Sequence, residues 1–348
     1  MLLKEQVKSI CKKITGSRIG IIGDFCVDIY WHADMTKSEL SRETPHYPLP
    51  VVKERVYPGA GGNVAFNLAA LNPAVLYPIS LYSDDWRGML MEDIIKKSGM
   101  DVRYMIKTEN RFTNAYCKPM RKGISSVEYE DPRLDFDNFE PIAHDIELRV
   151  INALHEVAEK VDILCVADHF KYGIVTDMVR NEIISLAKSG LTVVADSRYN
   201  ISKYTNCILK PNEVECWRAV YGDERYISAS YDEFVEAAEK LAVKNSACVF
   251  CTLGRRGSVV TDGEKVFKTD AVKYDGEIDI CGAGDTSLSA FSAALASGAS
   301  SEEAAAFAGL ASGVTVRKIG VTGTASAEEI VALAERYKKG DVKKAMTV

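Results

Sequence analysis

The stretch DICGAGDTSL, residues 279–288, places two glycines and an acid directly before a run of small residues. Glycines let backbone N–H groups approach an anion closely, and a helix start adds free N–H groups and a positive dipole end. Such a turn can hold a phosphoryl group during transfer, and Asp285 is placed to accept a proton from an attacking hydroxyl. The motif alone fits equally well a tight turn in which Asp285 only caps the helix.

The segment KPNEVE, residues 210–215, carries a second candidate site. Asn212 and Glu215 are three residues apart, so on the first turn of a helix they share a face. An amide and a carboxylate there suit Mg²⁺, which Glu215 could bind through a water molecule. The alternative is ordinary N-capping by Asn212 beside a solvated acid.

Three further segments could contact ligands. CTLGRRGS (251–258) ends a strand with glycines, which suits a backbone that passes close to a nucleotide. In GAGGNVAFN (59–67), Asn63 could bond sugar hydroxyls, and in GDFCVD (23–28), Asp28 could bind a vicinal diol. Each segment could instead serve only as a turn.

These residues must be positioned by the strands and helices around them. Apolar strands alternate with amphipathic helices, most regularly from residue 146 onward. This rhythm predicts an α/β fold, a mostly parallel sheet with helices on both faces, in a single domain over 1–348. Polar strand-like pieces at about 30–57 and 103–130 interrupt the rhythm and predict a small β-sheet lid.

Ligands of open α/β sheets bind at the carboxyl ends of the strands. We therefore expect the polar and glycine residues that follow the strands to share one crevice: Asp24, Asp28, Asp168, Asp196, Asn212, Glu215 and Gly254. Within it we assign Asp168, like Asp28, to the substrate side.

The composition excludes several functional classes. The net charge is −6 and no long basic run occurs, which argues against nucleic-acid binding. No apolar stretch is long enough for a membrane span, and lysines interrupt the apolar residues at the N-terminus, unlike a secretion signal. Nine scattered cysteines favour a reduced, cytoplasmic setting. Cys248 and Cys251 lie in an expected strand, which favours core cysteines over a zinc or redox site.

Together and in this order, the motifs resemble the ribokinase-like (PfkB) sugar kinases over nearly the whole chain. The resemblance implies a three-layer α/β/α sandwich and an ATP- and Mg²⁺-dependent kinase. It implies that Asp285 is the catalytic base and that Gly282, Ala283 and Gly284 form the anion hole. The implied sugar contacts are Asp28, Gly59 and Asn63.

The same resemblance assigns the nucleotide and cation sites. Asn212 and Glu215 would organise Mg²⁺ and phosphate. The turn 252–257 and the region 309–318 would hold the nucleotide base, with contacts from Thr252, Gly254, Gly257 and Gly313. Asp279 would belong to a monovalent-cation site, which would hold K⁺.

The N-terminal half resembles the bacterial heptose-7-phosphate kinases, on the segments GDFCVDIYW, LSRETP, PGAGGNVAFNLAAL and RLDF. Relatives of that kind often carry a fused nucleotidyltransferase domain, which we expect this chain to lack. Cys281 replaces a common Thr or Ser, and Ala60 replaces a glycine. Cys281 does not affect the expected kinase activity, because the backbone makes the anion hole. Ala60 and the lid differences, Arg42 and an insertion at 46–48, leave other sugars open as substrates, such as ribose, fructose or a related ketose or acid.

Two further expectations concern partners and activity. Members of the family commonly pair through the lid, and apolar lid residues such as Val51 and Val52 suit a homodimer. Arg121 and Arg133 could clamp a substrate phosphate or could be solvated surface residues. The rival to a kinase is a non-catalytic regulator that binds a sugar or nucleotide on the same fold.

Overall fold

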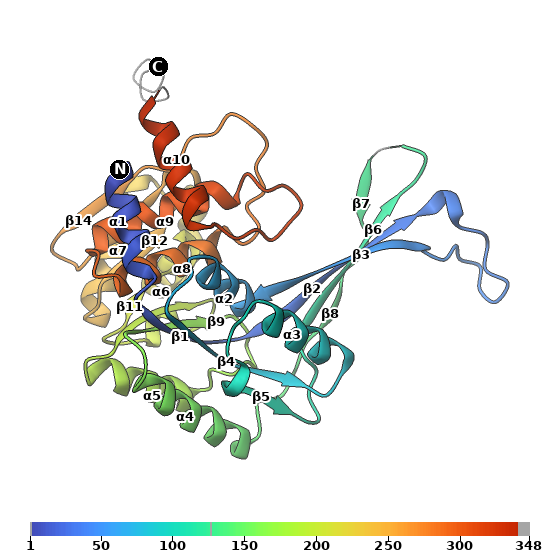
Figure 1. The fold of residues 1–348 in the computed structure, drawn as a ribbon, viewed down its shortest axis with the longest axis horizontal. Coiled ribbons are helices and arrows are strands. Elements are labelled where there is room, and N and C mark those ends of the chain that lie inside the picture. Colours follow the sequence, from blue (N-terminus) through green and yellow to red (C-terminus); the bar gives the residue numbers. More distant parts are fainter. Residues whose placement is uncertain (1, 126, 340–348) are drawn as a thin grey trace.

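A computed structural model describes residues 2–125 and 127–339, and the elements below refer to these residues (Figure 1). A nine-stranded sheet forms the centre, in the order β14-β13-β12-β11-β10-β9-β1-β4-β5. Its pairs are parallel except at β12–β13 and β13–β14. Its strands are β1 (Arg18–Gly23), β4 (Val75–Ser83), β5 (Met105–Thr108), β9 (Ile163–Asp168), β10 (Thr192–Ser197), β11 (Ile208–Leu209), β12 (Val249–Thr252), β13 (Ser258–Thr261) and β14 (Val266–Thr269).

Ten helices accompany this sheet in the described residues. They are α1 (Lys4–Ile14), α2 (Gly61–Ala70), α3 (Trp86–Lys97), α4 (His144–Ala158), α5 (Asp177–Lys188), α6 (Glu213–Tyr221), α7 (Tyr231–Asn245), α8 (Ala283–Ala296), α9 (Ser301–Thr315) and α10 (Ala327–Lys339). No helix among the described residues has the length and apolar character required to cross a membrane.

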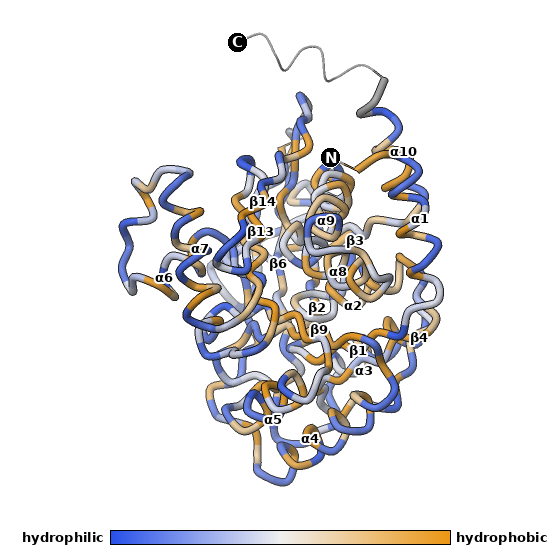
Figure 2. The backbone as a smooth tube through the Cα atoms, turned by 90° about the vertical axis from the view of Figure 1, so that its left-hand side faces the viewer, coloured by the Kyte–Doolittle hydropathy of each residue, from blue (hydrophilic) through white to orange (hydrophobic). Residues whose placement is uncertain are grey.

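The buried side chains form two clusters, one on each face of the sheet. Ile19 and Ile21 of β1 pack with α1, α2, α8, α9 and α10, whereas Ile22 packs with α4, α5, α6 and α7. Successive strand residues point to opposite faces, so an apolar run such as β1 serves both layers. The predicted three-layer α/β/α sandwich is confirmed, and Figure 2 shows apolar segments concentrated around β1 and β9.

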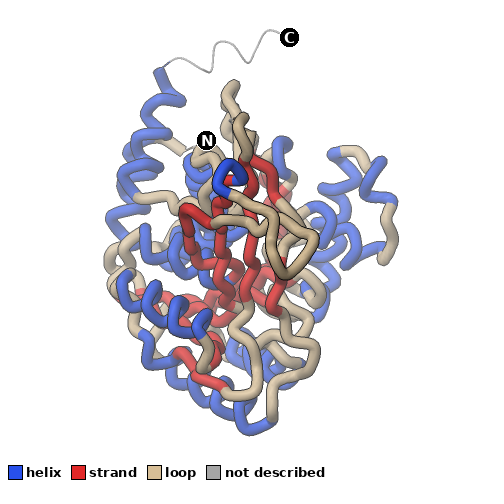
Figure 3. Tube along the Cα trace, turned by 90° about the vertical axis from the view of Figure 1, so that its right-hand side faces the viewer, coloured by secondary structure: helices blue, strands red, loops and turns tan. Residues whose placement is uncertain are grey.

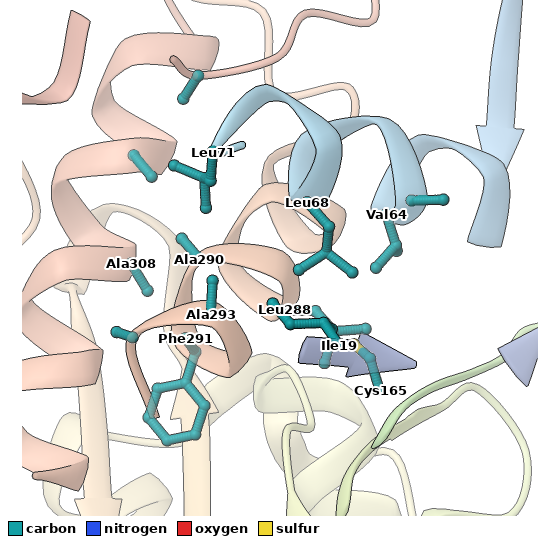
Figure 4. Close-up of a cluster of buried hydrophobic side chains, with 14 of the residues drawn as sticks. Ile19, Val64, Leu68, Leu71, Cys165, Leu288, Ala290, Phe291, Ala293 and Ala308 are labelled. Carbon is teal, nitrogen blue, oxygen red and sulfur yellow. The ribbon is translucent and has the colours of Figure 1, made fainter. Parts of the chain in front are cut away.

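Contact between α2 and α8 fixes the geometry of the candidate site. Val64 and Leu68 of α2 face Leu288 and Ala290 of α8, above Ile19 of the sheet (Figure 4). The small residues of α8 let neighbouring helices approach closely, which explains why this helix is buried on nearly every side. The first turns of α2 and α8 are thereby brought together.

A second, smaller sheet extends away from the central one (Figures 1 and 3). Its order is β3-β2-β6-β7, with β8 also paired to β6. Its strands are β2 (Phe25–Asp34), β3 (Val51–Ala60), β6 (Ala115–Lys122), β7 (Glu128–Glu130) and β8 (Leu134–Phe136). This is the sheet that the sequence predicted as a lid.

The predicted bounds of the lid need correction. The segment 103–130 was assigned to it, but Met105–Thr108 forms β5 and pairs in parallel with β4 at the edge of the central sheet. Ile106 is buried in the core there, and this tertiary contact decides which sheet the strand joins. The small sheet also includes β8, outside the predicted segment, and β2 begins at Phe25 rather than near residue 30.

Candidate active site

The glycine turn that ends at Asp285 opens helix α8, as predicted. Gly282 is the N-cap residue and has φ +76°, in the left-handed region. A Cβ on Gly282 would lie 2.7 Å from Nδ2 of Asn63, so the position also lacks room for a side chain. Cys281 and Gly284 are exposed, and the first N–H groups of a helix have no acceptor within it. The turn is therefore accessible to solvent, and the N–H group of Ala283 donates to the carbonyl oxygen of Ile280 at 3.2 Å.

Asp285 is held by a residue from α2. Nδ2 of Asn63 donates to Oδ2 of Asp285 over 2.7 Å. Oδ1 of Asn63 accepts from Nδ2 of Asn67 at 3.1 Å, and Oδ1 of Asn67 accepts from the hydroxyl of Thr286 at 3.1 Å. Asn67 thus fixes the orientation of the Asn63 amide, so that its N–H group points at the carboxylate.

The surroundings of Asp285 shift its pKa upward. Burial raises the pKa to about 6, and the nearby Asp196 carboxylate raises it too. The hydrogen bond from Asn63 and the charges of Lys210 and Arg198 act in the opposite direction. A carboxylate with a pKa near 6 is ionised at neutral pH and still basic enough to accept a proton from a reacting hydroxyl.

Lys210, which the sequence interpretation did not single out, lies beside the same turn. Its side chain is 3% exposed, and its Nζ lies 2.6 Å from Oδ2 of the buried Asp196. A Cβ on Gly284 would be only 3.7 Å from this ammonium group. Its position directly before the PNEVE segment was the available signal. The site therefore has a buried positive charge close to the backbone donors of the turn.

Asn212 and Glu215 form a capping box at the start of α6. Oδ1 of Asn212 accepts from the backbone N–H groups of Val214 and Glu215, both at 2.9 Å. Oε2 of Glu215 accepts from the backbone N–H of Asn212 at 2.8 Å. The capping alternative is therefore realised, but Glu215 is not a solvated acid. Burial, and then the charge of Asp196, raise its pKa to about 7.

The predicted nucleotide residues fall into two groups. Thr252 forms an isolated bridge with Asn212, so the ends of β12 and β11 meet at the capping box, where Gly254 follows with φ +56°. Gly257 and Gly313 have packing reasons to be glycine. A Cβ on Gly257 would overlap the carbonyl oxygen of Thr269, and one on Gly313 would lie 2.8 Å from Val272.

Asp28 and Gly59 lie together where the small sheet meets the body. Asp28 is 7% exposed, and its Oδ1 has no hydrogen-bond partner among the described residues. A Cβ on Gly59 would lie 2.9 Å from this oxygen. The ammonium group of Lys118 lies nearby, with its Nζ 3.9 Å from Oδ2. An unpaired buried carboxylate oxygen is unfavourable unless a ligand donates a hydrogen bond to it.

Asp24 and Asp168 take part in internal networks instead. Asp24 accepts from the backbone N–H groups of His169, Phe170 and Ile174. Oδ2 of Asp168 accepts from Ser197 at 2.7 Å and from Tyr204 at 3.0 Å, and the residue is 1% exposed. These acids satisfy buried donors, so the structure gives no support to the predicted substrate contact of Asp168.

Asp279 organises the loop that precedes the turn. Oδ1 accepts from the backbone N–H of Cys281 at 3.0 Å, and Oδ2 accepts from that of Gly320 at 2.9 Å. Its own backbone N–H donates to the carbonyl of Val316 at 2.8 Å. Asp279 therefore joins the loop 316–320 to the start of the turn.

The family to which the chain belongs follows from its sequence. The model of the pfkB family of carbohydrate kinases matches residues 51–328. The chain belongs to this family. The match includes the Gly59–Asn63 segment, the capping box and the turn that ends at Asp285. The glycine turn and Asp285 of this pfkB chain thus lie within the matched region.

Curated relatives and solved structures agree with the pfkB assignment. The chain is 29% identical over 332 residues to the bifunctional protein HldE of Nitratiruptor sp., covering 95% of this chain and 66% of that protein. HldE of Geobacter sulfurreducens is 27% identical over 334 residues, with 93% and 64% covered. The chain thus spans slightly less than two thirds of the length of these relatives.

Two solved structures share the ribokinase-like fold. The ribokinase of Arabidopsis thaliana, complexed with ribose and ATP, matches with a TM-score of 0.69 at 19% identity, covering 92% of this chain and 99% of that one. Phosphofructokinase-2 from Escherichia coli matches with a TM-score of 0.71 at 18% identity, covering 92% and 100%. At these identities the likeness concerns the fold, and it extends over almost the whole chain.

Proposed function

We propose that this pfkB chain transfers the γ-phosphoryl group of ATP to a sugar hydroxyl, with Asp285 as the base. The observation that carries the proposal is the placement of Asp285. Its carboxylate is held by Asn63 at the N-terminus of α8, next to exposed backbone donors and the ammonium group of Lys210. A proton acceptor, an anion-binding turn and a buried cation in one place suit phosphoryl transfer.

In this mechanism the substrate oxygen forms a bond to the γ-phosphorus as the bond from that phosphorus to the β–γ bridging oxygen breaks. The hydroxyl proton moves to Asp285, and ADP leaves. Backbone N–H groups of Gly282, Ala283 and Gly284 and the charge of Lys210 stabilise the negative charge that develops on the phosphoryl oxygens. The bond from Asn63 keeps Asp285 ionised until the hydroxyl is in place.

The residues near Lys210 fit an Mg²⁺ ion bound together with the nucleotide. The Asp196 carboxylate contributes to raising the pKa of both Glu215 and Asp285, which reflects an excess of negative charge at this site. No group of three potential ligands was found among the described residues, so water and nucleotide oxygens would complete the coordination. When bound, the ion would neutralise phosphate charge. Asp279 is the candidate for a K⁺ site.

A phosphorylated sugar is the substrate class that the site favours, with heptose 7-phosphate first because the relatives are HldE proteins. Oδ1 of Asp28 would accept a hydrogen bond from a sugar hydroxyl. Lys118, Arg133 and Arg198 lie close enough to lower the pKa of Asp28, although burial raises it overall. These cations would hold the substrate phosphate. Ribose or fructose kinase activity is the alternative.

The small sheet would act as a lid and as the surface of a homodimer. Its strands expose the large apolar side chains Val51, Val52, Tyr129 and Leu134, and the connection between β2 and β3 exposes Leu40, Tyr47 and Leu49. Single exposed apolar residues are common, but a set of them on one sheet and its connecting loop indicates a covered surface. Size measurement in solution tests the dimer, and Val51→Asp with Val52→Asp should dissociate it.

The decisive experiment measures ADP release with Mg·ATP and a panel of free and phosphorylated sugars. One or more sugars should stimulate release, and Asp285→Asn should lower turnover by roughly 10³-fold or more while sugar and ATP still bind. Glu302→Gln removes an exposed acid from the first turn of α9 and serves as the control. Turnover that survives in Asp285→Asn rejects the base, and sugar binding without any phosphorylated product supports the regulator.

A further inference from the structure

A side chain of the small sheet reaches the loop that Asp279 organises. Arg55 lies on β3, and its Nη1 donates to the carbonyl oxygen of Gly320 over 2.7 Å. The two residues are 265 positions apart. The bond thus joins the small sheet to a loop of the body.

Arg55 is oriented from several directions within the small sheet. Its Nε donates to Nε2 of His32 at 2.8 Å, and Nδ1 of His32 lies 2.6 Å from Oε1 of Glu128. Its guanidinium carbon is 5.1 Å from the centre of the Tyr30 ring and 5.9 Å from that of Tyr57. Residues on β2, β3 and β7 therefore hold the group, and it is not a freely rotating surface arginine.

The contact continues directly to the phosphoryl-binding turn. The N–H group of Gly320 donates to Oδ2 of Asp279, and Oδ1 of the same carboxylate accepts from the N–H of Cys281. Cys281 precedes Gly282, which is the N-cap residue of helix α8 and has φ +76°. Three hydrogen bonds, which run through Gly320, the Asp279 carboxylate and Cys281, thus connect Arg55 to the backbone donors of the turn.

The same strand also carries the proposed substrate contact. Gly59, four residues after Arg55, lies against Oδ1 of Asp28, and β3 leads through Ala60 into the helix that bears Asn63. A movement of β3 would therefore displace the proposed sugar contacts Asp28 and Gly59 and, through Arg55, would also displace the turn.

From this connection we infer that Arg55 is a positioning residue that couples the placement of the small sheet to the geometry of the turn at 281–284. With Arg55 bound to Gly320, the Asp279 loop holds the backbone donors ready for transfer. Without this bond the turn loosens, and water gains access as the phosphoryl acceptor. The inference rests on the proposed kinase function for its kinetic part only.

The experiment compares Arg55→Gln, Arg55→Lys and the control Lys53→Gln. Lys53 is exposed on the same strand, two residues away. In Arg55→Gln, kcat should fall about tenfold or more, the sugar KM should change less than threefold, and sugar-independent ATP hydrolysis relative to sugar phosphorylation should rise. Arg55→Lys should recover part of kcat, and Lys53→Gln should behave as wild type. A merely stabilising role would lower the melting temperature without this pattern.

Hydrogen exchange without any substrate provides an independent measurement. Amides of residues 316–322 and 281–284 should exchange at least threefold faster in Arg55→Gln than in the wild type or Lys53→Gln. Unchanged exchange overturns the inference even if kcat falls, and so does a kcat within twofold of the wild type. If the wild-type protein phosphorylates no sugar, the proposed function fails, while exchange still decides whether Arg55 controls the loop and the turn.

Discussion

Nδ2 of Asn63 lies 2.7 Å from Oδ2 of Asp285, although the two residues are 222 positions apart in the chain. The donor comes from the first turn of α2 and the acceptor from the first turn of α8, and the apolar contact between these helices brings them together (Figure 4). An N–H donor stabilises a carboxylate over the neutral acid. The pair therefore controls the protonation of the proposed base.

The pH profile of the reaction should report this control. Asp285 must be ionised to act, so kcat/KM should fall with a slope of one as the pH drops below about 6, the pKa to which burial raises this carboxyl group. Asn63→Ala removes the stabilising donor and should shift the acidic limb of the kcat/KM profile to higher pH by roughly one unit. A limb that stays in place or moves to lower pH would show that Asn63 does not set the ionisation of Asp285.

The partly buried charge of Asp285 should also destabilise the fold at neutral and alkaline pH. The folded-state pKa of about 6 lies above the ordinary value of 3.8, so ionisation favours the unfolded chain. Above pH 6 this amounts to at most about 3 kcal/mol, and less to the extent that water reaches the side chain. Asp285→Asn should raise the melting temperature by a few degrees at pH 8, and the gain should shrink by more than half at pH 4.5. Equal melting curves at pH 8 would contradict the expectation.

Lys210 offers a test that separates stability from chemistry. Lys210→Met leaves the Asp196 carboxylate, which is 5% exposed, without its partner at 2.6 Å. The free energy of unfolding should drop by about 3–5 kcal/mol, and Lys210→Met/Asp196→Asn should restore most of it. Turnover should stay at least about 100-fold low in both variants, because the charge near the turn is missing. Recovery of turnover in the double variant would mean that Lys210 acts only through Asp196.

Cys281 should make the enzyme sensitive to alkylation. All nine cysteines are free thiols, and Cys281 is the exposed one, directly before the glycine turn. Partial burial of the thiol raises its pKa above the ordinary value, so inactivation by iodoacetamide should be slow at pH 7 and accelerate steadily as the pH is raised.

Two controls accompany this measurement. Mg·ATP should protect the wild type, since the nucleotide would cover the turn. Cys281→Ser should keep activity, because the backbone forms the anion hole, and should resist the reagent. Equal inactivation of Cys281→Ser would place the reactive group elsewhere.

The sequence could not show which partner a residue finds when several elements compete for it. Met105–Thr108 carries the same strand signal whichever sheet it joins, and its pairing with β4 placed it in the central sheet. Asp168 follows a strand as a ligand residue would, yet Ser197 and Tyr204 occupy its Oδ2. Asn63 was predicted to contact sugar, but it is 1% exposed and both atoms of its amide are engaged inside the protein.

The sequence by itself determined the alternation of strands and helices, the three layers, and the turn that places Asp285 at a helix start. These features depend on local periodicity and on glycines whose backbone angles are fixed within a few residues. Only the tertiary structure decided which side chains meet. The bonds from Asn63 to Asp285 and from Arg55 to Gly320 depend on packing between elements that are distant in the sequence, and the bond from Lys210 to Asp196 depends on the pairing of two strands; no local pattern of residues encodes these contacts.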